Sequence, residues 1–209
     1  AQFSHSTKAE IAWTVIPVLI LVFMAFPATS ALVNMEVAPE TEMTVKITGF
    51  QWRWKYEYIE DDIAFISSLD AASNAARRLE SGTDVNGVEN YLLEVDKPLV
   101  LPANTKIKFL ITADDVIHSW WVPALGWKRD AVPGFINEAW TEINEPGVFR
   151  GQCAELCGKD HGFMPIVLHV LPRDEYTAWV AQQQDSARLA SNNDFIGSGL
   201  DLDNEVTSR

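Results

Sequence analysis

The sequence predicts a mainly β protein, a sandwich or barrel of short strands, attached to one N-terminal transmembrane helix. Three observations support this fold class. A run of 23 uncharged residues lies near the N-terminus, many short strand-like runs separated by glycine and proline follow it, and 47% of the 209 residues are hydrophobic. That content is enough for a packed core in a chain of this length. The strands do not alternate with helical patterns, which argues against a parallel α/β sheet.

The uncharged run extends from Ile11 to Val33. A helix of this length reaches about 34 Å, which is enough to cross a bilayer. Pro17 and Pro27 lie inside the run and favour packing against helices of a larger membrane protein. A cleaved signal peptide is the alternative, but the run is long for one and ends without a clear cleavage site. Lys8 before the run and glutamates after it place the following domain away from the cytoplasm.

Short strands are expected along the rest of the chain. Residues 43–58 alternate apolar and polar side chains, and residues 61–90 combine a helical pattern at 69–79 with a loop, which indicates an insertion. The pattern of residues 174–190 predicts a helix. From Ser191 onward, polar residues without periodicity predict a frayed tail. Further strands are expected at 91–95, 99–101, 106–113, 116–122, 139–143, 147–152 and 165–171. The predicted divisions are 1–35 (membrane helix and flank), 36–176 (β domain with the 61–90 insertion) and 177–209 (C-terminal helix and disordered tail).

The net charge of the chain is -13, and it contains no cluster of basic residues. A nucleic-acid role is therefore excluded, because nothing would neutralise the phosphates. A basic protein is the natural partner for such an acidic domain. The alternative is that the charge only keeps the domain soluble.

The strongest signal is a cluster of sulfur and nitrogen ligands. Cys153 and Cys157, the only cysteines, are followed by His161 and Met164, and His118 ends an apolar run upstream. Thiolates, thioethers and imidazoles together favour copper, and a weak methionine ligand is typical of electron-transfer sites. A disulfide is the alternative in an oxidising compartment, but the flanking histidine and methionine argue against it.

The second cysteine goes beyond what a mononuclear copper site needs. Two neighbouring thiolates can bridge two metal ions, each then capped by one imidazole, from His118 or His161. Met164 and a backbone carbonyl between the cysteines, expected to be that of Glu155, would take the remaining weak positions.

This spacing, Cys-x3-Cys-x3-His-x2-Met with an upstream His-Ser-Trp, resembles subunit II of haem-copper cytochrome c oxidase, which bears the dicopper Cu A centre. The resemblance covers residues 8–176 apart from the 61–90 insertion. It is carried by the ligand motif and by EIAWTVIP (10–17), GFQWRWKYEY (49–58), LEVD (93–96), VLP (100–102), DAVPG (130–134) and GQC (151–153).

The resemblance implies a cupredoxin-like Greek-key β-sandwich and an electron-transfer subunit of an aa3-type oxidase. Such a subunit takes electrons from cytochrome c and passes them to haem in subunit I, where oxygen is reduced to water with proton pumping. It implies two copper ions, a magnesium ion at the subunit I interface, and further oxidase subunits as partners. The location would be a bacterial inner membrane with the domain in the periplasm, or a mitochondrial inner membrane with the domain in the intermembrane space.

Individual roles also follow from the resemblance. Trp52 matches the tryptophan that receives electrons, the Glu155 side chain matches a magnesium ligand, and Glu10 matches the carboxylate at the entrance of a proton pathway. The copper ligands would be His118, Cys153, Glu155 through its carbonyl, Cys157, His161 and Met164. Acids resembling those near the cytochrome docking face are Glu57, Asp114, Asp115 and Asp130.

Other functions remain open at this point. The family usually has two membrane helices, and this chain offers only the second, so the first is expected to be lost, processed or supplied by a partner. A membrane-tethered copper-delivery protein is one alternative. The dicopper domain of another reductase is a second, although nitrous-oxide reductase has no such membrane helix. A quinol-oxidase subunit would lack Cys153 and Cys157.

Overall fold

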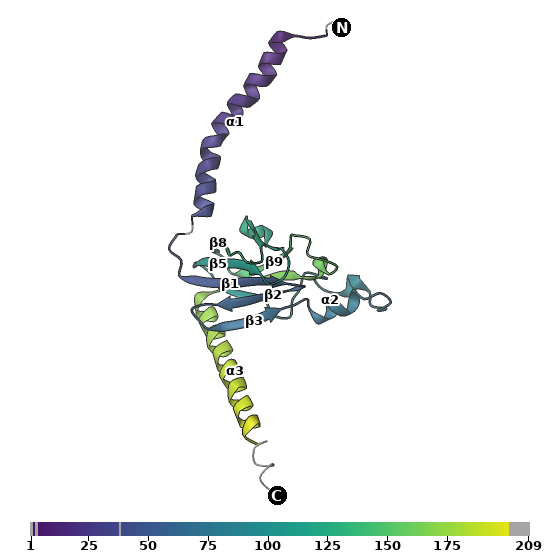
Figure 1. Cartoon of the computed structure of the whole chain (residues 1–209), viewed down its shortest axis with the longest axis vertical. Coiled ribbons are helices and arrows are strands. Elements are labelled where there is room, and N and C mark those ends of the chain that lie inside the picture. Colours follow the sequence, from purple (N-terminus) through teal and green to yellow (C-terminus); the bar gives the residue numbers. More distant parts are fainter. Residues whose placement is uncertain (1, 3, 38, 201–209) are drawn as a thin grey trace. The chain divides into compact units, whose positions relative to one another are not determined.

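The computed structural model describes residues 2, 4–37 and 39–200. The chain divides into two compact units, Ala1–Pro39 and Glu40–Arg209. The first contains one long helix, and the second contains two β-sheets and the remaining helices (Figure 1).

Helix α1, Thr7–Glu36, contains the whole uncharged run, including Pro17 and Pro27. It is long and apolar enough to cross a membrane, and the protein buries none of its side chains. A helix that is apolar on all sides is stable only when lipid or other helices surround it. The predicted N-terminal helix is therefore confirmed, with a few residues added at each end.

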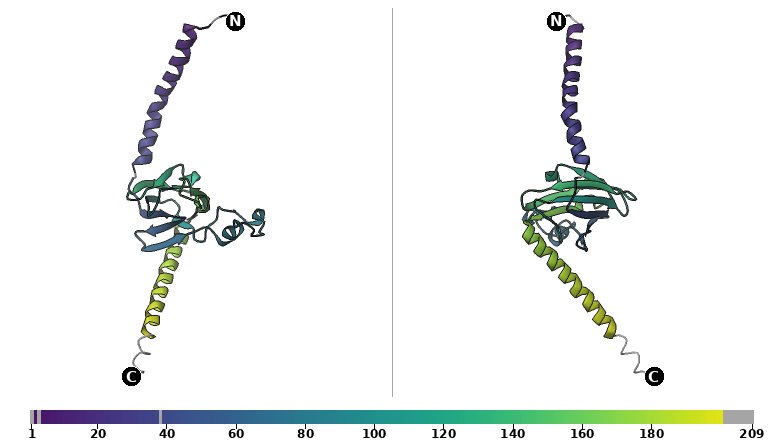
Figure 2. Two further views of the ribbon diagram at one scale, coloured as in Figure 1. Left: turned by 45° about the vertical axis from the view of Figure 1, so that its right-hand side comes forward. Right: turned by 90° about the vertical axis from the view of Figure 1, so that its left-hand side faces the viewer.

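The second unit is built on two five-stranded sheets, in the orders β3-β2-β1-β5-β8 and β4-β10-β9-β6-β7. Figure 2 shows these strands in two further views. The predicted β-sandwich is confirmed, but both sheets are mixed, because β1 pairs with β5 and β10 with β4 in parallel. Long connections between these partners permit parallel pairing. The strands are β1 Met43–Phe50, β2 Arg53–Tyr58, β3 Ile63–Ser67, β4 Leu99–Pro102, β5 Lys106–Ala113, β6 His118–Trp121, β7 Lys128–Ala131, β8 Asn137–Glu142, β9 Gly147–Cys153 and β10 Pro165–Leu171.

The core lies between the two sheets. Strand β5 alternates strictly, with Ile107, Phe109 and Ile111 fully buried and the residues between them partly exposed. This is the period of two that a strand with one buried face requires. Trp54 from the first sheet and Trp120 from the second are the largest fully buried side chains.

Three strand predictions differ from the structure. Residues 43–58 form a hairpin of β1 and β2, with the turn at residues 51 and 52, instead of one strand. Residues 91–95 form turns, since Leu92 has a positive φ, and only Val95 makes a bridge, to Leu69. Strand β7 was not predicted, because its sequence Lys-Arg-Asp-Ala lacks an apolar alternation.

The range predicted as an insertion, 61–90, contains a strand. Strand β3 pairs with β2 and extends the first sheet, and the segment between β3 and β4 follows it. It contains α2, Ala71–Ala76, whose N-terminus is capped by the Asp70 carboxylate, and the short 3-10 helix η1, Val85–Gly87. This segment projects from one end of the sandwich (Figure 1).

Helix α3, Arg173–Leu200, ends the described part of the chain. Its first turns are fixed to the sandwich, since Tyr176 is buried and the Trp179 ring lies 5.3 Å from that of Tyr58. The helix continues ten residues beyond the predicted end at 190, because no proline interrupts the segment from Ser191 onward. Residues 201–209 of the predicted tail lie outside the described residues.

Candidate metal centre

The second sheet brings the predicted ligands together. His118 begins β6 and Cys153 ends β9, and these two strands pair with Trp120 opposite Cys153. The chain then forms the segment Cys153–Met164, which we term the ligand loop, and it includes the 3-10 helix η3, His161–Phe163. Strand β10 follows directly at Pro165. The site is therefore formed at the end of one sheet, by two neighbouring strands and the loop that joins β9 to β10.

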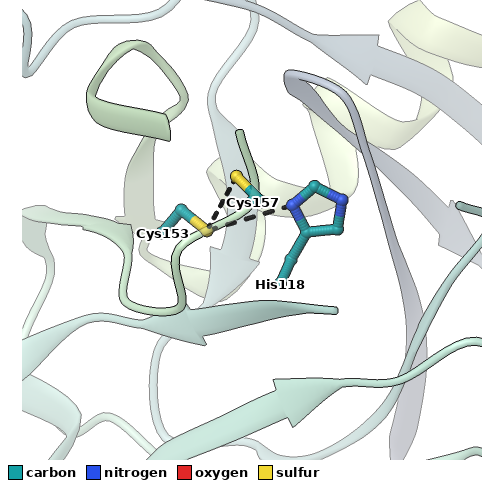
Figure 3. A group of neighbouring side chains, drawn as sticks. All are labelled: His118, Cys153 and Cys157. Carbon is teal, nitrogen blue, oxygen red and sulfur yellow. Dashed lines mark hydrogen bonds between the residues drawn. The ribbon is translucent and has the colours of Figure 1, made fainter. Parts of the chain in front are cut away.

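The ligand atoms converge closely. The Cys153 and Cys157 Sγ atoms are 3.9 Å apart, and His118 Nδ1 lies 4.0 Å from Cys153 Sγ (Figure 3). On the other side of the pair, His161 Nδ1 and Met164 Sδ each lie 3.5 Å from Cys157 Sγ. The thiol pair is therefore contacted by two imidazoles, so each metal ion of a thiolate-bridged pair would have one.

The donor set fits copper. His118 is fully buried, Cys153, Cys157 and Met164 are nearly so, and both cysteines are free thiols. Buried soft donors with two imidazoles are the ligands that copper prefers, whereas magnesium and calcium take oxygen ligands. The carbonyl of Glu155 lies 3.3 Å from Cys153 Sγ, so this oxygen also faces the cluster, while the Glu155 side chain is exposed.

The His118 ring is oriented by Asp115. Its Nε2 atom lies 2.9 Å from Asp115 Oδ1, so the tautomer that donates there leaves the Nδ1 lone pair directed at the sulfurs. Burial acts to raise the pKa of Asp115, but bonds from the Gln51 and Val116 amides and from His118 outweigh it and lower the pKa. The carboxylate therefore stays charged and is a strong acceptor for the histidine.

The turn between β1 and β2 of the first sheet also contacts the ligand loop. The carbonyl of Cys157 accepts hydrogen bonds from Gln51 Nε2 at 2.8 Å and from Trp52 Nε1 at 3.3 Å. Gly158 follows with a φ of 121°, and a Cβ there would lie 3.0 Å from the Gln51 amide nitrogen and 3.2 Å from the Trp52 ring. Only glycine allows the loop to approach the β1–β2 turn this closely.

The two thiols differ in acidity when no metal is bound. Burial acts to raise the pKa of Cys153, but hydrogen bonds from His118 and from the backbone outweigh it and lower the pKa to about 7. Burial and the neighbouring charge on Cys153 raise the pKa of Cys157 to about 12. The pair therefore gives up one proton readily, and a metal ion bridging both sulfurs would displace the second.

Three of the four acids assigned to a docking face have partners within the domain. Asp115 holds His118, Glu57 forms ion pairs with Lys46 and Lys55, and Asp130 forms one with Lys128. Such acids contribute less to an external partner than free carboxylates do. Asp114 is exposed, and no side-chain partner is found for it among the described residues.

The sequence did not reveal every residue of the site. Asp115 was interpreted only as a docking acid, although its position three residues before His118 could have indicated an orienting role. The contacts of Gln51, and of Trp54 Nε1 with the Met164 carbonyl at 3.4 Å, join residues over 100 positions apart and leave no local signal. Glu10 lies in α1, which belongs to the other compact unit.

Fold and site together define a membrane-anchored β-sandwich protein with a candidate copper centre. Residues 43–171 match the family model for the periplasmic domain of cytochrome c oxidase subunit II, and residues 1–30 match the model for its transmembrane domain. The chain therefore belongs to the cytochrome c oxidase subunit II family. The membrane anchor and the domain outside the cytoplasm follow from these two matches.

Individual relatives agree with this assignment. A probable cytochrome c oxidase subunit 2 of Rickettsia felis is 44% identical over 92% of this chain, and cytochrome c oxidase subunit 2 of Cereibacter sphaeroides is 40% identical over 87%. The chain spans 58% and 63% of the length of these two relatives. The crystal structure of the periplasmic domain of subunit II of cytochrome oxidase of Bradyrhizobium japonicum covers 72% of this chain and is matched over 99% of its own length, with 37% identity and a TM-score of 0.63.

Proposed function

We propose that this chain is the electron-transfer subunit of an aa3-type cytochrome c oxidase. A dicopper Cu A centre would accept one electron at a time from cytochrome c, for transfer to haem in subunit I. Oxygen reduction and proton pumping would take place in that other subunit, so this chain alone would not reduce oxygen. The observation that carries the proposal is the paired arrangement of Cys153 with His118 and Cys157 with His161.

The protein's own residues would hold the centre and limit its movement. His118, Cys153, Cys157, His161, Met164 and the Glu155 carbonyl would be the ligands. A largely buried ligand set held by two strands and the ligand loop changes little in geometry when the charge of the metal changes, which favours rapid electron transfer. Trp52 would receive electrons, and its indole contact with the Cys157 carbonyl supports this role.

Two further roles extend the proposal. The Glu155 side chain is exposed on the ligand loop, where it would bind a magnesium ion together with groups from subunit I. Glu10 lies in the first turn of α1 and would mark the entrance of a proton pathway in the assembled complex.

The proposed location is a bacterial inner membrane, with the β domain in the periplasm. Relatives from Rickettsia and Cereibacter and the solved periplasmic domain from Bradyrhizobium support it. A mitochondrial inner membrane, with the domain in the intermembrane space, is the alternative.

Copper loading tests the proposed centre. The full chain, reduced and supplied with copper in detergent, is expected to become purple and bind two copper ions. Its electron paramagnetic resonance spectrum should show seven lines, since one unpaired electron would be shared between two copper nuclei. One copper ion with a four-line spectrum would contradict the dicopper proposal. A colourless protein with a disulfide would remove the electron-transfer function altogether.

The salt dependence of electron uptake tests the proposed partner. Reduction of the copper-loaded chain by basic cytochrome c should slow as ionic strength rises from 10 to 200 mM, because charges are screened beyond about 10 Å at 0.1 M salt. Reduction by a small uncharged donor should change little over the same range. Equal salt profiles for the two donors would show that the net charge of -13 does not attract the partner.

A membrane-tethered copper-delivery protein is the second candidate function. It would need exchangeable ligands, but His118 is fully buried and hydrogen-bonded to Asp115, which favours retention of the metal. Rapid transfer of copper to an acceptor protein, without any reversible redox response, would support delivery instead.

A further inference from the structure

The segment inserted between β3 and β4 forms a small folded unit of its own. We term residues 68–96 the insert. Its two ends are joined by the bridge between Leu69 and Val95 and by a 2.7 Å hydrogen bond from the Ser68 amide to Asp96 Oδ1. Ser73 of α2 is fully buried, and its hydroxyl accepts a hydrogen bond from the Leu92 amide at 3.1 Å. The insert is therefore stabilised by contacts between its two ends and by a buried hydrogen bond within it, unlike an open surface loop.

One arginine of the insert contacts the ligand loop. Arg77 Nη1 donates to Asp160 Oδ1 at 3.3 Å, and its guanidinium lies over the Phe163 ring, 4.3 Å from the centroid. The same side chain is oriented by Asn74, whose Oδ1 atom accepts from Arg77 Nε at 2.8 Å. Asp160 and Phe163 flank His161, so Arg77 contacts the ligand loop on both sides of this ligand.

The other side of the insert is fixed to the strand that carries the first cysteine. Arg150 of β9 donates to Glu94 Oε2 at 2.7 Å and to the Leu93 carbonyl at 3.2 Å. Arg150 lies three residues before Cys153. The insert therefore connects β9, before the first thiol, with η3, at the second imidazole.

The two histidines are supported in different ways. His118 is fully buried and its Nε2 atom is held by Asp115, whereas His161 is only partly buried. Within the described part of the chain, the His161 ring is held by the two cysteines, through the contact of its Nδ1 atom with Cys157 and a hydrogen bond with Cys153, and no carboxylate orients it. Its position therefore depends on the backbone of η3 and on the residues that fix this short helix.

We propose that Arg77 is a positioning residue of the metal centre, which fixes the His161 side of the ligand loop through Asp160 and Phe163. The insert acts as a brace between β9 and η3. This inference rests on the metal-binding function proposed above. It assigns the insert a role in the centre, in addition to its place beside the cleft of about 360 Å³ that Trp52 and Arg77 help to line.

The test compares the full chain with its Arg77→Ala and Arg78→Ala variants, each loaded with copper. Arg78 is the matched control, because it is the next residue, is exposed, and its side chain makes no hydrogen bond, ion pair or ring contact among the described residues. Loss of the Arg77 ion pair and ring contact should accelerate copper loss to excess ethylenediaminetetraacetate by about threefold to tenfold. It should also change the hyperfine splitting in the paramagnetic resonance spectrum, because His161 would shift. Arg78→Ala should match the unchanged chain.

Further variants complete the test. Arg77→Lys retains the charge and should restore part of the slow copper release. Should Arg77→Ala fail to fold, Asp160→Asn removes the same ion pair from the loop side and should give the same two changes. Equal release rates and spectra for the Arg77 and Arg78 variants would overturn the inference, even if thermal stability fell. A failure of the unchanged chain to form the dicopper spectrum would instead refute the proposed function.

Discussion

Replacing Gly151 with alanine is expected to destabilise the β domain more than the same replacement at any other glycine of the strands. A Cβ at this position would lie 2.0 Å from the Trp121 carbonyl oxygen and 2.9 Å from Val122 Cα. Both are backbone atoms, so a side chain cannot rotate away, and β6 and β9 would have to separate. We expect a loss of about 2–4 kcal/mol in the free energy of unfolding.

Thermal unfolding of the metal-free chain measures this effect, with an expected fall in midpoint of roughly 5–15 °C. Gly147→Ala is the matched control on the same strand, because its added Cβ would lie 3.7 Å from the Phe149 ring, an ordinary contact. It should change the free energy of unfolding by about 0.5 kcal/mol or less. Similar midpoints for the two variants would mean that β6 and β9 are not packed as described.

Replacing Cys157 with serine is expected to abolish the proposed dicopper centre. Cys157 Sγ contacts three other groups of the cluster: Cys153 Sγ, His161 Nδ1 and Met164 Sδ. Replacing this sulfur therefore removes all three contacts. A serine hydroxyl is a hard, weakly acidic donor that binds copper poorly. We expect loss of the seven-line spectrum and a fall in electron uptake of about 100-fold or more.

The matched control for this variant is Leu156→Ser in the same loop. Leu156 is 78% exposed, and its replacement should leave two copper ions and the spectrum unchanged. In Cys157→Ser the free energy of unfolding should fall by about 1–2 kcal/mol, because a hydroxyl is buried in place of the thiol. Retention of both copper ions by that variant would exclude Cys157 as a bridging ligand.

Regular strands and the cluster of candidate ligands could be predicted from the sequence, because both depend on local patterns. The expected strands at 106–113 and 165–171 coincide with β5 and β10, where buried apolar residues dominate. The five side chains of the ligand motif were selected by residue type and spacing, and the structure brings all five together.

Features that depend on distant partners could not be predicted in this way. Strand β7 is charged and belongs to the sheet only through its pairing with β6. The ion pair of Arg77 with Asp160 joins residues 83 positions apart, and the helical pattern around Arg77 gives no sign of it. Strand β3, which lies within the predicted 61–90 insertion, was not expected because it is an edge strand with an irregular apolar pattern.

The hydrogen bond from Trp52 to the Cys157 carbonyl has a consequence for electron tunnelling. In the proposed role, an electron leaving the indole would cross this bond and then the carbonyl carbon, Cα and Cβ of the same cysteine before it reaches sulfur. The Gln51 side-chain amide donates a second hydrogen bond to the same oxygen, so thermal motion changes the length of that route very little. The β1–β2 turn would thereby hold the electron-transfer route at a constant length. Substitutions in this turn should change the rate of electron transfer even where the colour of the protein stays the same.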